Sequence, residues 1–180
     1  LREGLFGTLP AELHAALGAS LLNHLLATGR EGARAVRRAA SRLLRRGGME
    51  AERAGAVHQR LLVPMHAATM LLPAAIGDYT DFYASVHHAT NIGVMLRPDQ
   101  PLMPNYKWIP IGYHGRASSV VPSGTAVRRP TGQLRPDPTV DPVVAPTRSL
   151  DYELEVGAFV CGEHALGERV PLAAAESRLF

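Results

Sequence analysis

The sequence predicts an α+β protein whose first third is helical and whose remainder is mainly β. Two observations predict this division. Apolar residues recur at helical spacing from Leu13 to Leu25 and again between Arg30 and Arg46. From Met65 onward that periodicity ends, and short apolar or alternating runs lie between prolines and glycines, as strands lie between turns. With 180 residues, the chain is long enough to bury a core.

The first expected helix begins at Pro10, because proline is favoured in the first turn of a helix. It continues to Gly29, a residue that commonly ends helices. Its apolar face is a stripe of leucines, Leu13, Leu17, Leu21 and Leu25. This face should pack against another element.

The second expected helix, Arg30 to Arg46, carries seven arginines around an apolar stripe and stops at Gly47-Gly48. The stripe consists of Val36, Ala39, Ala40, Leu43 and Leu44. Such a helix could bind nucleic acid or an anionic membrane surface. The alternative is a solvated face, since no aromatic residues are interleaved for base stacking and the whole-chain charge is only +3. A third, shorter helix is expected over Glu50 to Leu62, closed by Pro64.

The strands are expected in the remainder of the chain, at Val94–Leu96, Trp108–Ile111, Val120–Val121, Thr125–Val127 and Glu153–Val160. The last has the strongest pattern. The proline-rich stretch Arg135 to Pro146 cannot hold a central strand, because each proline removes a ladder donor. We expect an extended surface connection there, crossing the molecule rather than turning a hairpin.

Composition limits the cellular setting. No apolar run reaches the roughly 18 residues that cross a bilayer, and residues 1–10 lack the pattern of a secretory signal. The single cysteine, Cys161, excludes an internal disulfide and fits a reducing compartment; it follows an apolar run, so we expect a buried or half-buried, inert thiol. Without an initiator Met, and with an apolar pattern at Leu179-Phe180, the sequence is expected to be part of a longer one.

Chemically active residues are concentrated between Ile76 and Gly93. Carboxylates are hard oxygen ligands, phenols donate hydrogen bonds, and imidazoles exchange protons near neutral pH. The stretch contains two of each, Asp78 and Asp81, Tyr79 and Tyr83, and His87 and His88. It is either a site or a polar loop whose aspartates cap turns and whose histidines are solvated.

A second feature is the pair Glu153 and Glu155 at the start of the last expected strand. Alternate residues of a strand project to one face, so the two carboxylates would stand side by side and repel unless a cation lies between them. A hard cation such as Ca²⁺ or Mg²⁺ draws oxygens from separate segments, and the carboxylates near Asp81 could supply others. The alternative is the wet face of an edge strand.

A third feature is the loop from Pro110 to Ser119. Gly112 and Gly115 allow tight turns or close approach to a ligand, and neighbouring side chains offer donors that could hold an anion. These donors are Tyr113, His114, Arg116, Ser118 and Ser119. The spacing is not that of a phosphate loop, and Tyr113 or His114 could equally be a core or turn residue.

Together these segments resemble the fumarylacetoacetase family, also called fumarylacetoacetate hydrolases. The shared motifs are D-Y-T-D-F-Y from Asp78, H-A-T-N from His88, G-Y-H-G-R-A-S-S from Gly112, R-R-P-x-G-Q from Arg128 and L-D-x-E-L-E from Leu150. The resemblance covers roughly residues 65–169 and is weaker before them. It implies the end of an SH3-like N-terminal domain and its helical connector at residues 1–64, then the first half of a mainly β catalytic domain at 65–180, truncated.

The resemblance also implies an activity, namely metal-dependent hydrolysis of the carbon–carbon bond of fumarylacetoacetate to fumarate and acetoacetate, in tyrosine and phenylalanine breakdown. A cytoplasmic homodimer with a small diketo acid substrate, without nucleic-acid or membrane partners, is expected. The nearest alternative is hydrolysis or decarboxylation of another diketo or oxo acid. A nucleic-acid or membrane-surface binding module that uses the arginine-rich helix is the alternative from another class.

Position by position, the resemblance assigns the roles in the site. The metal ligands, for Mg²⁺ or Ca²⁺, fall on Asp81, Glu153 and Glu155, the water-activating base on His88, and substrate contacts on Tyr83, Arg97 and Tyr113. Val86-His87 stands where the family has Arg-Gln, so a second imidazole lies beside the base. The family's remaining site groups fall beyond Phe180, so we expect this chain alone to be inactive.

Overall fold

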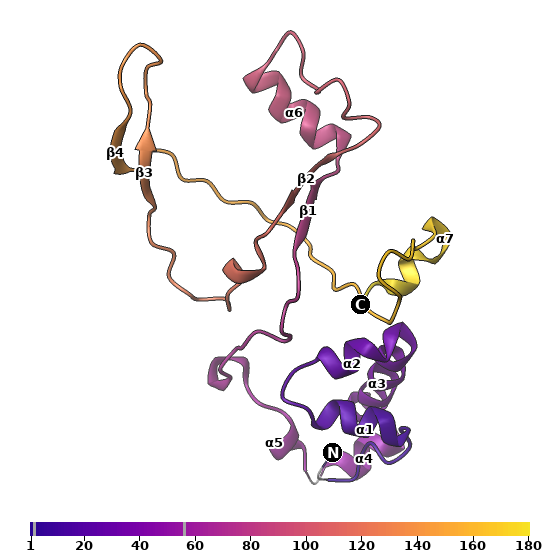
Figure 1. Cartoon of the computed structure of the whole chain (residues 1–180). Helices are drawn as coiled ribbons and strands as arrows, with labels where there is room; N and C mark the ends of the chain where they lie inside the picture. Colours follow the sequence, from indigo (N-terminus) through magenta and orange to yellow (C-terminus); the bar gives the residue numbers. More distant parts are fainter. Residues whose placement is uncertain (2, 56) are drawn as a thin grey trace. The chain divides into compact units, whose positions relative to one another are not determined.

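The computed structural model describes residues 1, 3–55 and 57–180 (Figure 1). The chain forms two compact units: a larger unit of Leu1–Ala74 with Ser123–Phe180, and a smaller unit of Ala75–Pro122. Helices and two small sheets agree with the α+β class. The SH3-like domain and the boundary expected at residue 65 stay predictions.

In the larger unit, α1 (Ala11–Gly18) follows Pro10 as expected, but the single helix expected to Gly29 is wrong. Ala19 is extended, with ψ 155°, and α2 (Asn23–Ala27) begins after a break. Gly18 and Ser20 are weak helix formers, which favours a break there. The leucine stripe is therefore divided, and Leu21, inside the break, is 39% exposed.

The second helix, α3 (Gly29–Leu44), is confirmed. Its buried residues Ala39 and Leu43 lie on the apolar stripe, while Val36 and Ala35 pack against a cluster of α1 and α2 residues, Leu13, Ala16 and Leu25. The helix ends at an extended Arg45, and Gly47 takes the positive φ of 73° that turns the chain away.

Three arginines of α3 form ion pairs. Arg34 pairs with Glu31 at 2.7 Å, Arg42 with Glu50 at 3.7 Å, and Arg30 with Glu176 at 2.9 Å. Part of the basic face is thus neutralised locally, which agrees with a solvated, ion-paired face.

The helix expected over Glu50–Leu62 appears as two short ones, α4 (Met49–Gly55) and α5 (His58–Leu61). Position 56, which the expected helix also spans, lies outside the described residues. A 3₁₀ turn, η1 (Met65–Ala67), follows Pro64.

The last part of the chain packs on α2 within the larger unit. Cys161 is buried with Leu26 and Ala74, and Phe159 covers them, which confirms the expected buried thiol. The Gly162 N–H donates to the Leu26 carbonyl at 3.3 Å. A short α-helix, α7 (Leu172–Ala175), and a 3₁₀ turn, η3 (Glu176–Arg178), follow in the last residues.

The connection expected to cross the molecule instead turns a hairpin. Strand β3 (Thr131–Leu134) pairs antiparallel with β4 (Val143–Pro146), with Leu134 opposite Val143. In the turn, Asp137 accepts hydrogen bonds from the Thr139 hydroxyl at 2.6 Å and the Thr139 N–H at 2.7 Å. The prolines are tolerated because both strands of a two-stranded sheet are edges.

Most of the expected strands are wrong. Val94–Leu96 is helical, the strand at Trp108–Ile111 starts only at Ile111, and neither Val120–Val121 nor Thr125–Val127 is a strand. In Glu153–Val160, only Val160 forms a bridge, to Leu179. Leu154 and Val156 are 99% and 100% exposed, so the apolar side chains of this alternating pattern pack against nothing in the described structure.

The smaller unit holds β1 (Thr80–Tyr83), α6 (Val86–Leu96), β2 (Ile111–His114) and the turn η2 (Ala117–Ser119) (Figure 1). β1 and β2 pair antiparallel, and α6 stands between them in sequence. None of the helices in the described ranges combines the length and apolar content needed to cross a membrane.

Candidate functional site

One face of the β1–β2 pair gathers three of the predicted site residues. Asp81 lies directly opposite Tyr113, and Tyr83 lies opposite Ile111. Side chains alternate along a strand and directly paired residues share a face, so Asp81, Tyr83 and Tyr113 project to the same side. Asp81 and Tyr83 are half-buried, whereas Thr80 and Phe82 on the other face are exposed.

His88 joins this group from the first turn of α6. Ser85 is the N-cap residue, and its hydroxyl accepts a hydrogen bond from the His88 N–H at 3.3 Å. The imidazole stands edge-on to the Tyr83 ring, with centroids 5.0 Å apart and planes at 82°. Only two residues separate β1 from α6, so the end of the strand and the start of the helix are held together.

The neighbouring His87 is exposed. One residue along a helix rotates the side chain by about 100°, so two adjacent histidines cannot face the same ring. The Tyr83 contact therefore belongs to His88.

Arg97 lies away from this group. It is the C-cap residue of α6, nine residues after His88, which corresponds to about 13 Å along the helix axis. Its guanidinium donates to the Pro101 carbonyl at 3.3 Å, on the loop that follows the helix. The structure does not bring Arg97 together with His88.

Glu153 and Glu155 belong to the larger unit, in an exposed stretch outside any strand. The strand geometry expected to place them side by side is absent there. Asp81 with these glutamates is chemically suited to a hard divalent cation. Yet the described residues contain no assembled group of three or more His, Cys, Asp or Glu side chains that could hold a metal.

Two of the other polar residues make local bonds. The Asp78 carboxylate accepts a hydrogen bond from the N–H of the next residue, Tyr79, at 2.7 Å. The Arg116 side chain donates to the Ser119 hydroxyl at 3.1 Å instead of lying open for an anion. Gly115 has a φ of 75°, so the turn after β2 requires glycine.

Tyr106 contacts this group through Tyr83 and was not predicted from the sequence. It is 6% exposed, and its ring is edge-on to Tyr83 with centroids 6.5 Å apart and planes at 79°. The pair Pro104-Asn105 just before it is typical of a turn, and the Tyr106 N–H donates to the Met103 carbonyl at 3.0 Å, but a turn does not identify a buried ring.

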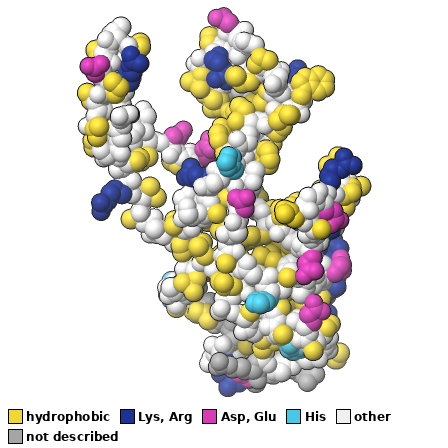
Figure 2. Space-filling model, viewed as in Figure 1, with side chains coloured by type: hydrophobic (Ala, Val, Ile, Leu, Met, Phe, Trp, Pro, Cys, Tyr) yellow, Lys and Arg dark blue, Asp and Glu magenta, His cyan; other side chains and the backbone are white. Residues whose placement is uncertain are grey.

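The outer surface of the smaller unit is rich in exposed apolar side chains, among them Phe82 at 56%, Met95 at 70% and Trp108 at 85%. Figure 2 shows hydrophobic side chains frequent over α6 and the β1–β2 pair in this view. The unit thus leaves much apolar area uncovered.

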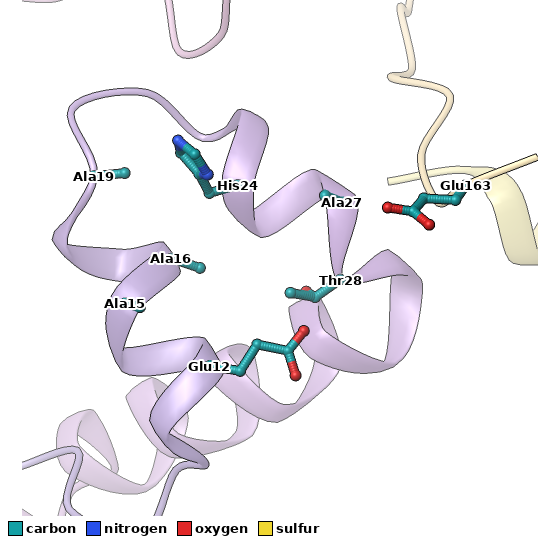
Figure 3. Close-up of a pocket in the computed structure, with 8 residues that line it drawn as sticks. All are labelled: Glu12, Ala15, Ala16, Ala19, His24, Ala27, Thr28 and Glu163. Carbon is teal, nitrogen blue, oxygen red and sulfur yellow. The ribbon is translucent and has the colours of Figure 1, made fainter.

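A separate pocket of about 460 Å³ lies in the larger unit (Figure 3). Its lining is Glu12, Ala15, Ala16, Ala19, His24, Ala27, Thr28 and Glu163. Its two carboxylates come from different segments, Glu12 from α1 and Glu163 from the segment after Cys161 (Figure 3). None of the predicted site residues lines it.

Comparison with known proteins gives the affiliation of the chain. The family model described as "Fumarylacetoacetase N-terminal" matches residues 1–73. The fumarylacetoacetase of Caenorhabditis elegans is 54% identical over 126 residues, which are 69% of this chain and 30% of that protein. For that of Bos taurus the identity is 54% over 125 residues, again 69% and 30%.

The fumarylacetoacetase of Homo sapiens is 54% identical over 115 residues, 63% of this chain and 27% of that protein. An alignment of 126 residues is longer than the 73 residues that the family model matches. The similarity to the relatives therefore also includes residues beyond 73. The chain spans about 30% of the length of the curated relatives it matches. Taken together, the family model and the relatives show that the chain belongs to the fumarylacetoacetase family.

Proposed function

We propose that the protein to which this chain belongs hydrolyses the carbon–carbon bond of fumarylacetoacetate, giving fumarate and acetoacetate in tyrosine and phenylalanine breakdown. The proposal is supported by the relatives, which are named fumarylacetoacetases. The observation that carries it is the cluster of Asp81, Tyr83, Tyr113 and His88 on one side of the β1–β2 pair.

In this proposal His88 is the general base. Its free ring nitrogen takes a proton from water, and the hydroxide so formed attacks the carbonyl carbon that becomes the new carboxylate of fumarate. The bond to the neighbouring carbon then breaks, its electron pair stays with the acetoacetate fragment, and a proton completes that product. Positioned general bases contribute about 10²- to 10⁴-fold to rate.

Asp81, Glu153 and Glu155 are proposed to hold Mg²⁺ or Ca²⁺. All three are carboxylates, the ligands that such hard cations prefer. When bound, the cation would stabilise negative charge that develops on the diketone oxygens. In the described structure both glutamates are exposed and lie outside any strand, so their carboxylates are accessible to a cation.

Tyr83 and Tyr113 are proposed to orient the substrate. They flank Asp81 on the same face, so their phenols could donate hydrogen bonds to substrate oxygens close to the cation. Arg97 is proposed to bind a substrate carboxylate. Its 3.3 Å bond to the Pro101 carbonyl is long and exposed, so the guanidinium can leave it at little cost.

The test is an ultraviolet assay of diketone loss with chromatographic identification of products. A protein of full family length containing this chain should consume fumarylacetoacetate in a reaction that needs Mg²⁺ or Ca²⁺ and gives fumarate and acetoacetate in equal amounts. The 180-residue chain alone should show no turnover, since the resemblance places the family's remaining site groups outside it. Faster consumption of another diketo or oxo acid would identify that acid as the substrate, with the same residues forming the site.

A cytoplasmic location and a homodimer are also proposed, on the resemblance to the family. Light scattering on the full-length protein would give twice the subunit mass if the dimer is correct. A monomer mass at micromolar concentration would contradict it.

A further inference from the structure

Tyr106 has an unusual position in the smaller unit. Among the described residues of that unit, it is the only large side chain that is buried, the others being Ala89 and Gly93. It is held by consecutive turns, in which its own N–H donates to Met103 at 3.0 Å and the Trp108 N–H donates to Asn105 at 2.9 Å. The backbone on both sides of Tyr106 is thus held by hydrogen bonds.

Three rings form a continuous series of contacts. Tyr106 stands edge-on to Tyr83, with centroids 6.5 Å apart, and Tyr83 stands edge-on to His88, with centroids 5.0 Å apart. Edge-to-face pairs favour one relative orientation, because the positive edge of one ring meets the negative face of the other. The orientation of the Tyr106 ring therefore restricts that of Tyr83, and Tyr83 restricts the imidazole.

His88 needs such support. It is exposed on the first turn of α6, and its side chain would otherwise be free to change rotamer. Tyr83 is itself on a two-stranded sheet, an arrangement that is marginally stable in water without packing from elsewhere. The buried Tyr106 ring supplies that packing.

We propose that Tyr106 is a positioning residue: its ring holds Tyr83, and through Tyr83 it fixes the imidazole of His88 in one orientation. The role of His88 in this inference rests on the proposed function, but the ring contacts do not. The phenol oxygen of Tyr106 has no hydrogen-bond partner among the described residues. Removing it should therefore do no harm, and the ring is the part that acts.

The first experiment uses nuclear magnetic resonance on the 180-residue chain. Tyr106→Leu should shift the ring-proton resonances of His88. Without the Tyr106 ring the neighbouring Tyr83 ring changes position, and the ring-current effect of Tyr83 on the imidazole protons changes with it. Tyr106→Phe keeps the ring and should leave them in place. Trp108→Leu is the matched control, since this aromatic lies in the same turn but is 85% exposed, and it should also leave them in place.

The second experiment measures turnover of fumarylacetoacetate by the full-length protein. Tyr106→Leu should lower kcat about 10-fold to 10²-fold with little change in KM, the pattern of a misplaced catalytic group. Tyr106→Phe, which keeps the ring, should leave kcat close to that of the unaltered protein. A general loss of stability in Tyr106→Leu would instead lower the amount of folded enzyme, which thermal unfolding of the same variants would detect.

The outcomes are separable. Unmoved His88 resonances in Tyr106→Leu would overturn the inference even if hydrolysis is observed. Shifted resonances in a protein that does not hydrolyse fumarylacetoacetate would support the ring contacts and reject the proposed function. Equal effects of Tyr106→Phe and Tyr106→Leu would overturn the role of the ring. If Tyr106→Leu fails to fold, nuclear Overhauser contacts from Tyr83 to both Tyr106 and His88 in the unaltered chain decide, and their absence overturns it.

Discussion

Ser85 and Tyr83 hold His88 from two directions, one through its backbone and the other through its ring. A serine N-cap satisfies one of the otherwise unpaired N–H groups at the start of a helix. Because α6 begins here, the same hydroxyl that starts the helix also sets where the imidazole emerges. The candidate base thus depends on a residue that has no chemical role in hydrolysis.

Ser85→Ala should destabilise the protein by about 0.5 to 1 kcal/mol, the lower part of the usual range for a lost N-cap, since the bond is long at 3.3 Å. Ser85→Asp, which can also cap, is the matched control and should stay near the original stability. Urea unfolding of the three proteins measures the difference. Equal losses in both variants would mean that the hydroxyl bond is not what stabilises α6.

Asp137 gives a prediction for pH. The Thr139 hydroxyl and then the Thr139 N–H, both donating to the carboxylate, hold the pKa of Asp137 below its ordinary value. A lowered pKa means that the unfolded chain binds the proton more readily. The turn between β3 and β4 is therefore stabilised above the ordinary Asp pKa, and that contribution is lost as pH falls through the folded value.

A carbon-13 titration of the Asp137 carboxyl group measures this pKa. The midpoint should lie below that of an unstructured Asp, and Thr139→Ala should move it upward because the hydroxyl donor is gone. A midpoint that Thr139→Ala leaves unchanged would show that the hydroxyl bond does not form in solution.

At the scale of elements, α6 is fixed at its far end by the loop that carries Pro101. Gly93 is buried there, and a Cβ at this position would overlap the Pro101 carbonyl and come within 2.8 Å of its Cα. Both neighbours are backbone, which cannot rotate away. The close approach of helix and loop therefore requires glycine.

Gly93→Ala should destabilise the protein by roughly 1 to 3 kcal/mol, the usual cost of overpacking, even though alanine favours helices. Gly77→Ala in the same unit is the control, because its Cβ would meet nothing within 4 Å. Thermal unfolding should show a large loss for the first and little change for the second. A stabilised Gly93→Ala would contradict the packing of this loop on α6.

The sequence predicted helices better than strands, and the reason is physical. The stripe of α3 is decided by local spacing, so Ala39 and Leu43 could be placed in advance. A strand needs a partner at a distance, which local alternation does not identify; Leu154 and Val156 alternate correctly yet pair with nothing described. β4 was missed for the converse reason. The prolines of residues 135–146 argued against a central strand, but Val143–Pro146 pairs with β3 as an edge strand.

The candidate site was predicted in part. Tyr83 and His88 could be assigned by resemblance, and the ring contact brings them together. The side-by-side placement of Glu153 and Glu155 could not be obtained from alternation alone, since it depends on a strand that does not form. Tyr106 was missed because burial is decided by tertiary packing rather than by its neighbours in sequence.

At the scale of the whole molecule, the proposed metal site draws its carboxylates from distant parts of the sequence, Asp81 from one and Glu153 with Glu155 from the other. Glu153→Gln in the full-length protein should weaken Mg²⁺ binding strongly, because an amide replaces one of three charged ligands. Glu163→Gln is the control, a carboxylate of the same unit outside the proposed set. Calorimetry with Mg²⁺ alone measures both, and equal affinity in the two variants would place the metal elsewhere.

The central claim, that the cluster around His88 carries out hydrolysis, is tested most directly by turnover of fumarylacetoacetate in the full-length protein with His88→Ala and His87→Ala. His88→Ala should lower kcat by about 10²-fold or more, the usual scale for a lost general base, while Mg²⁺ binding is retained. His87→Ala should change kcat much less, since His88 makes the ring contact with Tyr83. Activity that survives His88→Ala and is lost in His87→Ala would contradict the account.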